Sequence, residues 1–289
     1  MDFTLTEYKK LLYSLQTLGF LFQPFEEFVK TKPFKGIVLR HDVDLLPQNS
    51  LKFAQIQHEM GIHTTYYFRI VSESFNEGII KEIMNLGHEI GYHYETMDTA
   101  FAKYKVKIGI ERKSRFSWSE KSKVEKGTDE YEQLLDLAYE EFCINLESFR
   151  KFYPVTTVCM HGSPRSEYDN KDIWKKYAYK SLGIIGEPYY DVDFNEVFYL
   201  TDTGRRWDGY KVSVRDRIPV HQERWNKEGL VFHSTQDIIN AINSNKFPNK
   251  VMLTFHPQRW NDKPLPWAKE LIFQNAKNLV KYFIVKSIL

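Results

Sequence analysis

The chain has 289 residues, of which 42% are hydrophobic and 27% are charged, and this composition is typical of a folded protein. Its net charge of +2 provides no overall field that would attract nucleic acid. No apolar run approaches the roughly 18 residues of a membrane span, and the first residues lack a secretory signal. Cys143 and Cys159 lie in unlike settings, so we expect both to be reduced, in a cytoplasmic protein.

The first part of the chain predicts helices that alternate with short apolar strands. Residues 4–19 have the spacing of an amphipathic helix, with Thr4 and Glu7 as a capping box, and a short helix follows Pro24. Further along, we expect strands at residues 36–44, 64–70 and 88–95, and helices at 48–60 and 76–86. This alternation predicts an α/β fold with a parallel sheet or barrel.

A basic segment interrupts the alternation. Between Lys103 and Lys126 the chain has nine lysine and arginine residues against three glutamates, so we expect residues 97–127 to form an exposed basic insertion. Beyond it, we expect helices at residues 129–153, 235–244 and 264–284, strands at 156–160 and 251–255, and a β-rich stretch at 183–233. Residues 1–289 would then form one domain, in which residues 1–33 pack on the barrel as an N-terminal helical layer.

Ionisable residues occur where four of these strands end. They are Asp42 and Asp44 after IVLR, His93 and Glu95 after EIGY, His161 after TVCM and His256 after VMLTF. Because the carboxyl ends of parallel strands share one face, we expect these residues to form one site. Strand side chains alternate, so Asp42 and Asp44 point one way while His41 and Val43 point the other.

This set of residues is typical of a metal site. Two neighbouring carboxylates repel each other unless a cation lies between them, and one could bind a metal while the other acts as a base. Imidazole and carboxylate ligands suit zinc. Each residue alone has a plainer interpretation, since HDVD could be a solvated acidic turn and any histidine a structural one. His58, His63, His221 and His233 have no such setting and are interpreted as structural or surface residues. His88 precedes its strand and is interpreted as a surface residue.

Six short motifs occur along the chain. They are LRHDVD (39–44), GIHTTYYF (61–68), LGHEIGYHYE (86–95), CMHGSP (159–164), LTDTGRRWDG (200–209) and TFHPQRW (254–260). In this order the chain resembles the polysaccharide deacetylases, carbohydrate esterase family 4 with the NodB-homology domain, and in particular the deacetylase-like proteins encoded in O-antigen and capsule biosynthesis loci. The resemblance implies a deformed (β/α) barrel and a metal-dependent hydrolase that cleaves the linear amide C–N bond of an N-acetylated sugar.

The resemblance also implies residue roles. Asp42 matches the catalytic base, Asp44 and His93 match metal ligands, and His256 matches the catalytic acid. Asp202 could orient His256 or a hydroxyl group of the substrate.

The pattern differs from that of the family at the third metal ligand. The family's second metal-binding histidine lies four residues after the first, and this chain has Met97 there, whose thioether is a poor ligand for such a site. We expect His161 to supply the third ligand, with Glu95 as the alternative.

Five residues are candidate substrate contacts: Arg205, Arg206, Trp207, Trp260 and Tyr94. The arginines could bind a carboxylate, phosphate or diphosphate, or could be solvated. The tryptophans could stack on a sugar ring or could pack in the core.

The expected substrate is an N-acetylated sugar, nucleotide- or lipid-linked, used in cell-surface polysaccharide synthesis at the inner face of the membrane. The basic segment 103–126 could lie against an anionic membrane, or could be a solvated loop. We expect no nucleic-acid partner. A catalytically impaired glycan-binding protein on the same fold is the alternative function, and a metal-dependent phosphoesterase is a further enzyme compatible with the motifs.

Overall fold

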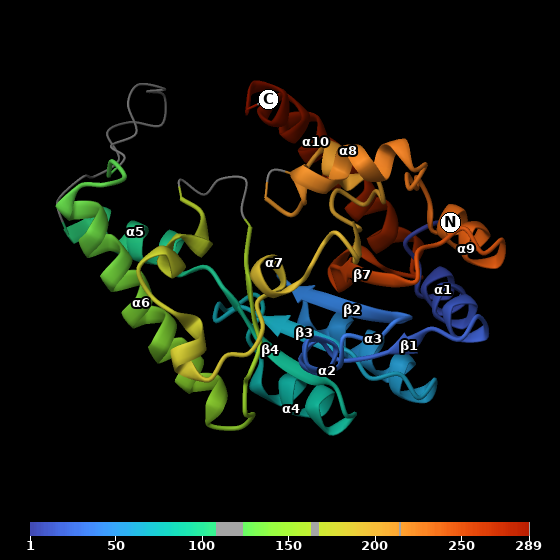
Figure 1. The fold of residues 1–289 in the computed structure, drawn as a ribbon, viewed down its shortest axis with the longest axis horizontal. Coiled ribbons are helices and arrows are strands. Elements are labelled where there is room, and N and C mark those ends of the chain that lie inside the picture. The colour runs from blue at the N-terminus through green and yellow to red at the C-terminus, as the bar shows by residue number, and fades with distance from the viewer. Residues whose placement is uncertain (108–123, 163–167, 214, 289) are drawn as a thin grey trace.

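The computed structural model describes residues 1–107, 124–162, 168–213 and 215–288. Its strands are parallel and form one sheet that curls into a half-barrel, with helices around it (Figure 1). The strands are β1 (Leu21–Phe22), β2 (Gly36–Val43), β3 (Thr65–Phe68), β4 (Glu89–Tyr94), β5 (Val158–Met160), β6 (Phe198–Thr201) and β7 (Lys250–Phe255). Six of them follow the order β5-β4-β3-β2-β7-β6, and β1 pairs with the start of β2. The predicted α/β class with a parallel sheet is confirmed.

The helices connect the strands in the predicted alternation. They are α1 (Leu5–Thr17), α2 (Phe25–Thr31), α3 (Pro47–Glu59), α4 (Glu77–Asn85), α5 (Thr96–Lys107), α6 (Asp129–Arg150), α7 (Pro188–Asp191), α8 (Pro219–Lys227), α9 (Thr235–Asn243) and α10 (Pro264–Ile288). The hydroxyl group of Thr4 accepts a hydrogen bond from the backbone N–H of Glu7 and so caps α1, as predicted. Gly61 and Gly87 follow α3 and α4 with positive φ angles, which glycine adopts without strain.

The two N-terminal helices cover different parts of the half-barrel. Helix α1 packs on the outer face of the sheet, where the ring of Tyr8 meets that of Phe255. Helix α2 lies at the amino-terminal ends of β3 and β4, because the Thr65 hydroxyl accepts a hydrogen bond from the backbone N–H of Phe25 at 2.7 Å. The carboxylate of Glu89 likewise accepts one from the backbone N–H of Glu26 at 3.0 Å. Helix α2 therefore covers the end of the half-barrel opposite the carboxyl ends of the strands.

Two histidines belong to a buried polar network on the outer face of the sheet. His41 donates from Nδ1 to the Thr65 carbonyl oxygen at 3.0 Å and accepts at Nε2 from the Gln57 amide at 2.9 Å. His88 donates from Nε2 to the Ala54 carbonyl oxygen at 3.0 Å, and burial lowers its pKa to about 4. Burial likewise lowers the pKa of His41 to about 3. The prediction that His88 is a surface residue is therefore wrong.

The predicted insertion at residues 97–127 is not exposed at its start. Helix α5 packs against α6 and buries Met97, Ala100 and Phe101. Their spacing of three and four residues is that of an apolar helical face, which the high lysine content of the segment obscured. The rest of the insertion, residues 108–123, lies outside the described residues.

The prediction that residues 183–233 are β-rich is also wrong. The described residues of this stretch contain one strand, β6, between helices α7 and α8. Aromatic residues of this stretch that lie outside β6 also pack into the core. Phe194 and Trp225 are examples, since both are buried against rings of neighbouring residues.

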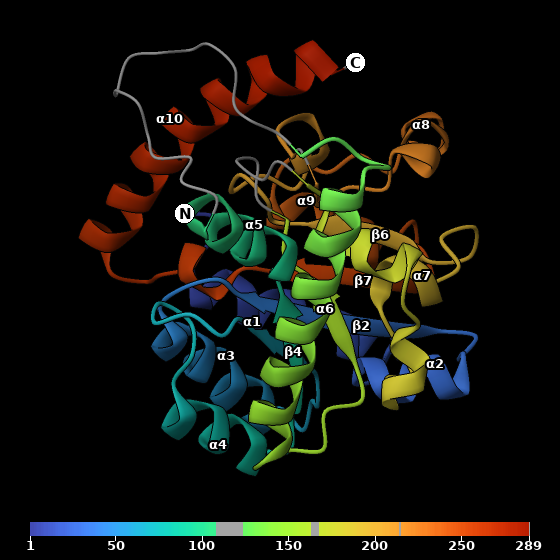
Figure 2. The same cartoon turned by 90° about the vertical axis from the view of Figure 1, so that its left-hand side faces the viewer.

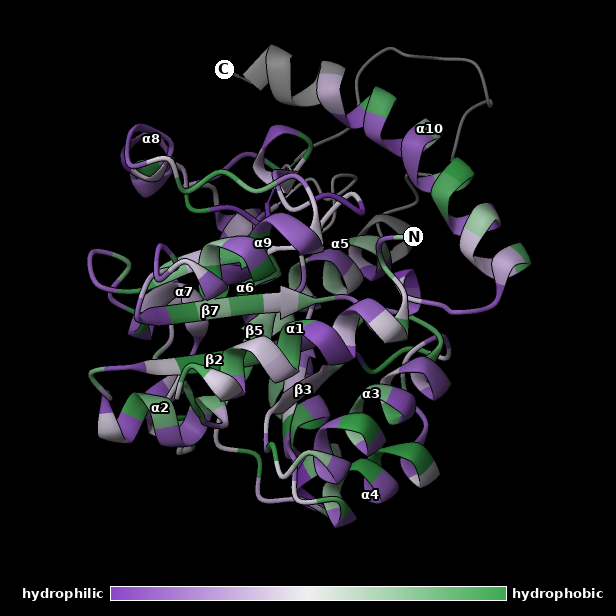
Figure 3. Ribbon diagram, turned by 90° about the vertical axis from the view of Figure 1, so that its right-hand side faces the viewer, coloured by the Kyte–Doolittle hydropathy of each residue, from purple (hydrophilic) through white to green (hydrophobic). Residues whose placement is uncertain are grey.

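The last helix, α10, crosses one end of the molecule, apart from the other helices (Figure 2). Hydrophobic and hydrophilic residues are interleaved along it (Figure 3). Within the described part of the chain, no helix combines the length and the apolar character that crossing a bilayer requires.

Candidate metal centre

Three side chains from three strand ends converge on one point. Asp44 follows β2, His93 lies in β4 and His161 follows β5. The Oδ1 atom of Asp44 is 3.6 Å from Nε2 of His93 and 3.2 Å from Nδ1 of His161, and the two nitrogens are 3.2 Å apart. Ligands at zinc bond lengths and tetrahedral angles lie roughly 3.3–3.4 Å apart. These three residues could therefore hold a metal ion.

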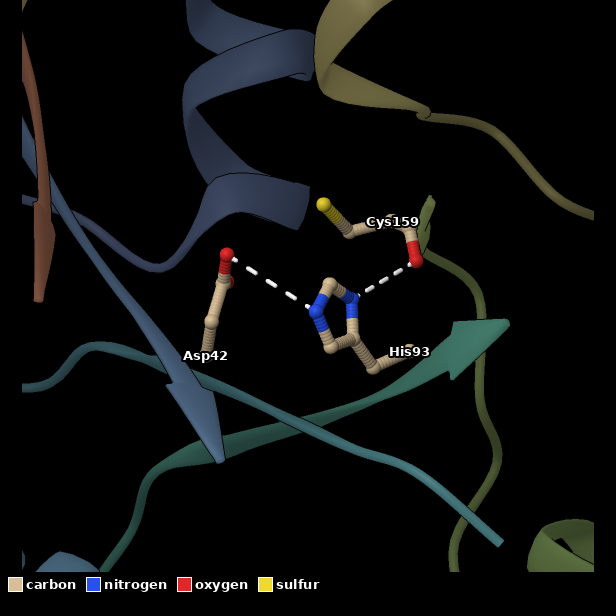
Figure 4. A group of neighbouring side chains, drawn as sticks. All are labelled: Asp42, His93 and Cys159. Carbon is tan, nitrogen blue, oxygen red and sulfur yellow. Dashed lines mark hydrogen bonds and ion pairs between the residues drawn. The ribbon is translucent and has the colours of Figure 1, made fainter. Parts of the chain in front are cut away.

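Hydrogen bonding fixes the orientation of His93. Its Nδ1 atom lies 2.9 Å from the carbonyl oxygen of Cys159, which can only accept a hydrogen bond, so Nδ1 carries the proton. Figure 4 shows the ring of His93 between Asp42 and Cys159, with Nδ1 directed at that oxygen. Burial lowers the pKa of His93 to about 4. The neutral imidazole thus directs the lone pair of Nε2 at the converging point, which is the arrangement of a metal ligand.

The carboxylate of Asp44 has an unsatisfied oxygen at this point. Burial would raise the pKa of Asp44, but His161 and His256 hold it well below its ordinary value, so the group is charged. Its Oδ1 atom is buried, and apart from the imidazole nitrogens of His93 and His161 it has no hydrogen-bonding partner among the described residues. Its Oδ2 atom accepts a hydrogen bond from Gln258 at 3.3 Å. A cation would satisfy the free oxygen, so the donor set fits a divalent metal.

A second group, formed by Asp42, His93 and Cys159, could also hold a metal ion by distance alone. Its donors suit a metal less well. Arg40 donates to both carboxylate oxygens of Asp42, at 2.9 and 2.7 Å. Burial raises the pKa of the Cys159 thiol well above its ordinary value, so the sulfur stays protonated. The group with Asp44 is therefore the better candidate.

Of the two residues predicted as the third ligand, the structure places His161 and not Glu95 in the favoured group. Both carboxylate oxygens of Glu95 accept hydrogen bonds from Arg69, at 3.0 and 2.7 Å. Its nearest carboxylate oxygen is 4.0 Å from Nε2 of His161, on the far side of that ring from the metal-facing Nδ1. Met97 is buried in α5 and supplies no ligand. The ion pair with Arg69 thus explains why Glu95 is not available.

The predicted base, Asp42, lies beside the favoured group. Its Oδ2 atom is 3.8 Å from Nε2 of His93, and the two hydrogen bonds from Arg40 fix the plane of its carboxylate. Sequence reasoning missed Arg40, although the alternation that paired Asp42 with Asp44 also places Arg40 on the same side of the strand.

His256 and Asp202 form a second polar unit at the site. Nδ1 of His256 lies 2.6 Å from Oδ1 of Asp202, and Oδ2 of Asp202 accepts hydrogen bonds from the backbone N–H of His256 and from Nε1 of Trp260. Burial would raise the pKa of Asp202, but the charges of His256 and Arg259 lower it. Asp202 is therefore a charged acceptor that turns Nε2 of His256 toward Asp44, 3.8 Å from its Oδ2 atom.

These residues share one cavity of about 500 Å³. Its walls include the predicted residues Asp42, Asp44, His93, His161 and His256. Side chains of α10 form another part of its lining, among them Gln274, Lys277 and Lys281.

The two predicted arginine contacts lie outside this cavity. Arg205 donates from Nη1 to the carbonyl oxygen of Trp267 at 2.7 Å, and its guanidinium group lies over that indole ring. Arg206 forms two hydrogen bonds with Asp208, at 2.8 and 2.9 Å. Arg205 has a positive φ angle in the turn after β6. Neither side chain lines the cavity, so a role in substrate binding stays a prediction for both.

The three predicted aromatic contacts are buried in the core and do not line the cavity. Trp207 donates from Nε1 to the hydroxyl group of Thr235, and Trp260 donates to Asp202. Tyr94 packs against Trp174 on the outer side of β4. The core interpretation of the tryptophans holds, and none of these rings can stack on a ligand in this cavity.

Two further cavity residues had no clear signal in the sequence. Asp216 lies outside any helix or strand, and its carboxylate accepts hydrogen bonds from Thr201 and Thr203 while lying 3.5 Å from Arg40. Gln258 lies two residues after His256 and has a buried oxygen without a described hydrogen-bond donor. Only the folded arrangement brings them to the site.

Comparison of the chain with protein-family models, with curated proteins and with solved structures found no match. The geometry of the centre and the sequence motifs therefore indicate the function.

Proposed function

We propose that the protein is a metal-dependent hydrolase that removes the N-acetyl group from an amino sugar, on a deformed (β/α) barrel of the polysaccharide deacetylase type. The observation that carries the proposal is the triangle of Asp44, His93 and His161 at the carboxyl ends of parallel strands. A separately held carboxylate, Asp42, and a separately held imidazole, His256, line the same cavity. The order of the sequence motifs supports the same reaction.

Zinc is the metal that this donor set suits best. Two imidazole nitrogens and one carboxylate oxygen are ligands of zinc, and three protein ligands leave a position for a reactant. A zinc ion held there would polarise an amide carbonyl group and make water more acidic.

Asp42 is the proposed general base. The two hydrogen bonds from Arg40 hold its carboxylate in one orientation, and it faces the cavity beside the metal ligands. It takes a proton from the water molecule that attacks the amide carbon.

His256 is the proposed general acid. Asp202 accepts the Nδ1–H hydrogen bond and stabilises the imidazolium form, while Nε2 faces the cavity. Nε2 donates its proton to the leaving nitrogen as the C–N bond breaks, so the products are acetate and a free amino sugar.

A non-catalytic glycan-binding protein is the competing function. Asp42 and His256 are both held by charged partners at the cavity wall, which an acid–base mechanism uses and simple binding does not need. The presence of both favours the enzyme. We propose a nucleotide- or lipid-linked substrate at the inner face of the membrane, and contact through residues 103–126 stays a prediction because 108–123 lie outside the described residues.

Acetate release from N-acetyl sugars tests the proposal. The purified protein is loaded with zinc and incubated with free, phosphorylated and nucleotide-linked N-acetylglucosamine. We expect acetate from at least one of them and none after removal of the metal. A protein that binds one zinc ion and these sugars but releases no acetate would be a binding protein.

A further inference from the structure

Three of the four carboxylates that line the cavity have close partners, and the fourth, Glu270, belongs to helix α10. Asp42 is bound by Arg40, and Asp44 faces the two histidines of the centre. Asp216 accepts hydrogen bonds from threonine and tyrosine hydroxyl groups and lies beside Arg40. These three carboxylates therefore have partners other than the lysines of α10.

Helix α10 contributes a row of polar side chains to the same cavity. The row is Glu270, Gln274, Lys277 and Lys281. Its spacing of four, three and four residues places the side chains on one face of the helix. Glu270 lies about 10 Å along the helix axis from Lys277, at a rise of roughly 1.5 Å per residue. Lys277 and Lys281 form no ion pair or hydrogen bond with any described residue.

The surroundings of these lysines are positively charged. Burial, together with the charges of Arg259 and Lys277, lowers the pKa of Lys281 to about 8. Asp216 and Asp44 act in the opposite direction, but each already has closer partners. At pH 7 the amino group of Lys281 is still mostly protonated, so two cations without an ion-pair partner among the described residues border the cavity, Lys281 half-buried and Lys277 exposed. An anion that entered between them would relieve their repulsion.

We propose that Lys277 and Lys281 bind a phosphate group of the substrate, an inference that rests on the proposed function because it places the acetylated sugar at the metal centre. A phosphate ester carries about one to two negative charges at pH 7. A phosphate on the ligand would therefore match the charge of two lysines better than a carboxylate on the ligand would. The cavity of about 500 Å³ is within the usual range for ligand pockets, roughly 300–1,000 Å³. The substrate is then a phosphorylated N-acetyl sugar.

A phosphorylated sugar could be linked to a nucleotide or to a lipid, and the two share the group that the lysines bind. Leu265, Ile272 and Leu279 are exposed, and their helical spacing places them on the face of α10 opposite the row that lines the cavity. The experiment therefore includes both a nucleotide-linked and a lipid-linked form.

Binding to matched sugars is measured first, by calorimetry. The ligands are N-acetylglucosamine and N-acetylglucosamine 1-phosphate, which differ only in the phosphate. We expect the Lys277→Gln/Lys281→Gln double variant to lose at least about tenfold in affinity for the phosphorylated sugar, because charged hydrogen bonds contribute on this scale. Its affinity for the neutral sugar should not change. Lys269→Gln is the control, since it removes the same charge from an exposed site on α10 outside the cavity.

Equal affinity of the double variant and the original protein for the phosphorylated sugar would overturn the inference. So would equal affinity of the original protein for the two sugars. Both results are independent of catalysis, so they decide the inference even if no acetate is released.

Acetate release then separates this inference from the proposed function. Equal kcat/KM values for the neutral and phosphorylated sugars would overturn the phosphate site and leave the deacetylase intact. Phosphate-dependent binding without acetate release from any sugar would support the phosphate site and overturn the deacetylase. The kcat/KM values for UDP-N-acetylglucosamine and for a polyprenyl diphosphate-linked N-acetyl sugar in vesicles identify the source of the phosphate.

Discussion

Buried histidines occur in two regions of this molecule, and their partners differ. On the outer face of the sheet, His41 and His88 each donate one hydrogen bond to a backbone carbonyl group and accept one from a neutral N–H group. At the strand ends, His93 and His161 face each other and the charged oxygen of Asp44. The first pair is fully satisfied by neutral groups, whereas the second leaves lone pairs directed at one point.

A lowered pKa alone does not identify the region. Burial lowers the pKa of His88 and of His93 to about 4 in both cases. Burial would also lower the pKa of His161, but the charge of Asp44 raises it above its ordinary value. The chemistry of the partners is what distinguishes a structural histidine from a candidate ligand. The following changes test that distinction.

The largest effect is expected from Asp44→Ala. Loss of this carboxylate removes one of the three ligands and leaves the two imidazoles without a counter-charge. We expect the metal content, measured by elemental analysis, to fall from about one zinc ion per chain to near zero. Acetate release should be lost with it. His88→Gln, in the outer region, should keep the full metal content. Metal loss in both variants would show that the two regions are not distinct.

The next effect is expected from Asp42→Asn. The amide fills the same space but cannot take a proton, so acetate release should fall by about 10²–10⁴-fold. Zinc content should stay near one, because Asp42 is outside the favoured ligand group. If the variant instead lost its metal while it stayed folded, Asp42 would be a ligand, and the group with Cys159 would be the metal site.

Stability at low pH tests the outer region. The pKa of His88 is lowered to about 4 in the folded state from an ordinary value of 6.5, so only the unfolded state takes up a proton between these values. The free energy of unfolding should therefore decrease as the pH falls below 6.5, by about 2 kcal/mol at pH 5 from this residue. His88→Gln retains an N–H donor for the Ala54 carbonyl group and should lose this dependence.

Urea denaturation of the original protein and of His88→Gln at pH 7 and pH 5 measures the effect. Between pH 7 and pH 5, the free energy of unfolding should decrease more for the original protein than for the variant. If the two proteins differed in free energy of unfolding by the same amount at both pH values, His88 would not be a neutral buried residue in the folded state.

The smallest effect is expected from Gln258→Leu. The amide of Gln258 donates a hydrogen bond to Oδ2 of Asp44 and so orients this ligand from outside the metal group. Loss of such a contact should weaken zinc binding by about tenfold, as measured by competition with a chelator. Gln236→Leu, on the exposed side of α9, is the matched control. An unchanged zinc affinity would show that Asp44 is held without Gln258.

Residues whose positions follow from strand alternation could be predicted from the sequence. Asp42 and Asp44 share a side of one strand, and the parallel sheet brings His93, His161 and His256 to the same end. The choice between His161 and Glu95 could not be made in this way, because it depends on Arg69, which directly follows the neighbouring strand β3. Pairing across strands is not visible in the local pattern.

Tertiary placement decides which of the other residues reach the cavity. Arg205, Arg206 and Trp207 follow a strand end, but none of them lines the cavity. Lys277 and Lys281 are more than 230 residues from Asp44 along the chain and reach the cavity only because α10 packs beside it. No local motif marks such a residue.

The position of a bound zinc ion tests the central claim most directly. A crystal of the zinc-loaded protein, measured on both sides of the zinc absorption edge, gives an anomalous difference map. We expect one peak of full occupancy about 2 Å from Oδ1 of Asp44, Nε2 of His93 and Nδ1 of His161. A peak bonded instead to Cys159 and Asp42, or no peak near these residues in protein shown to contain zinc, would contradict the account.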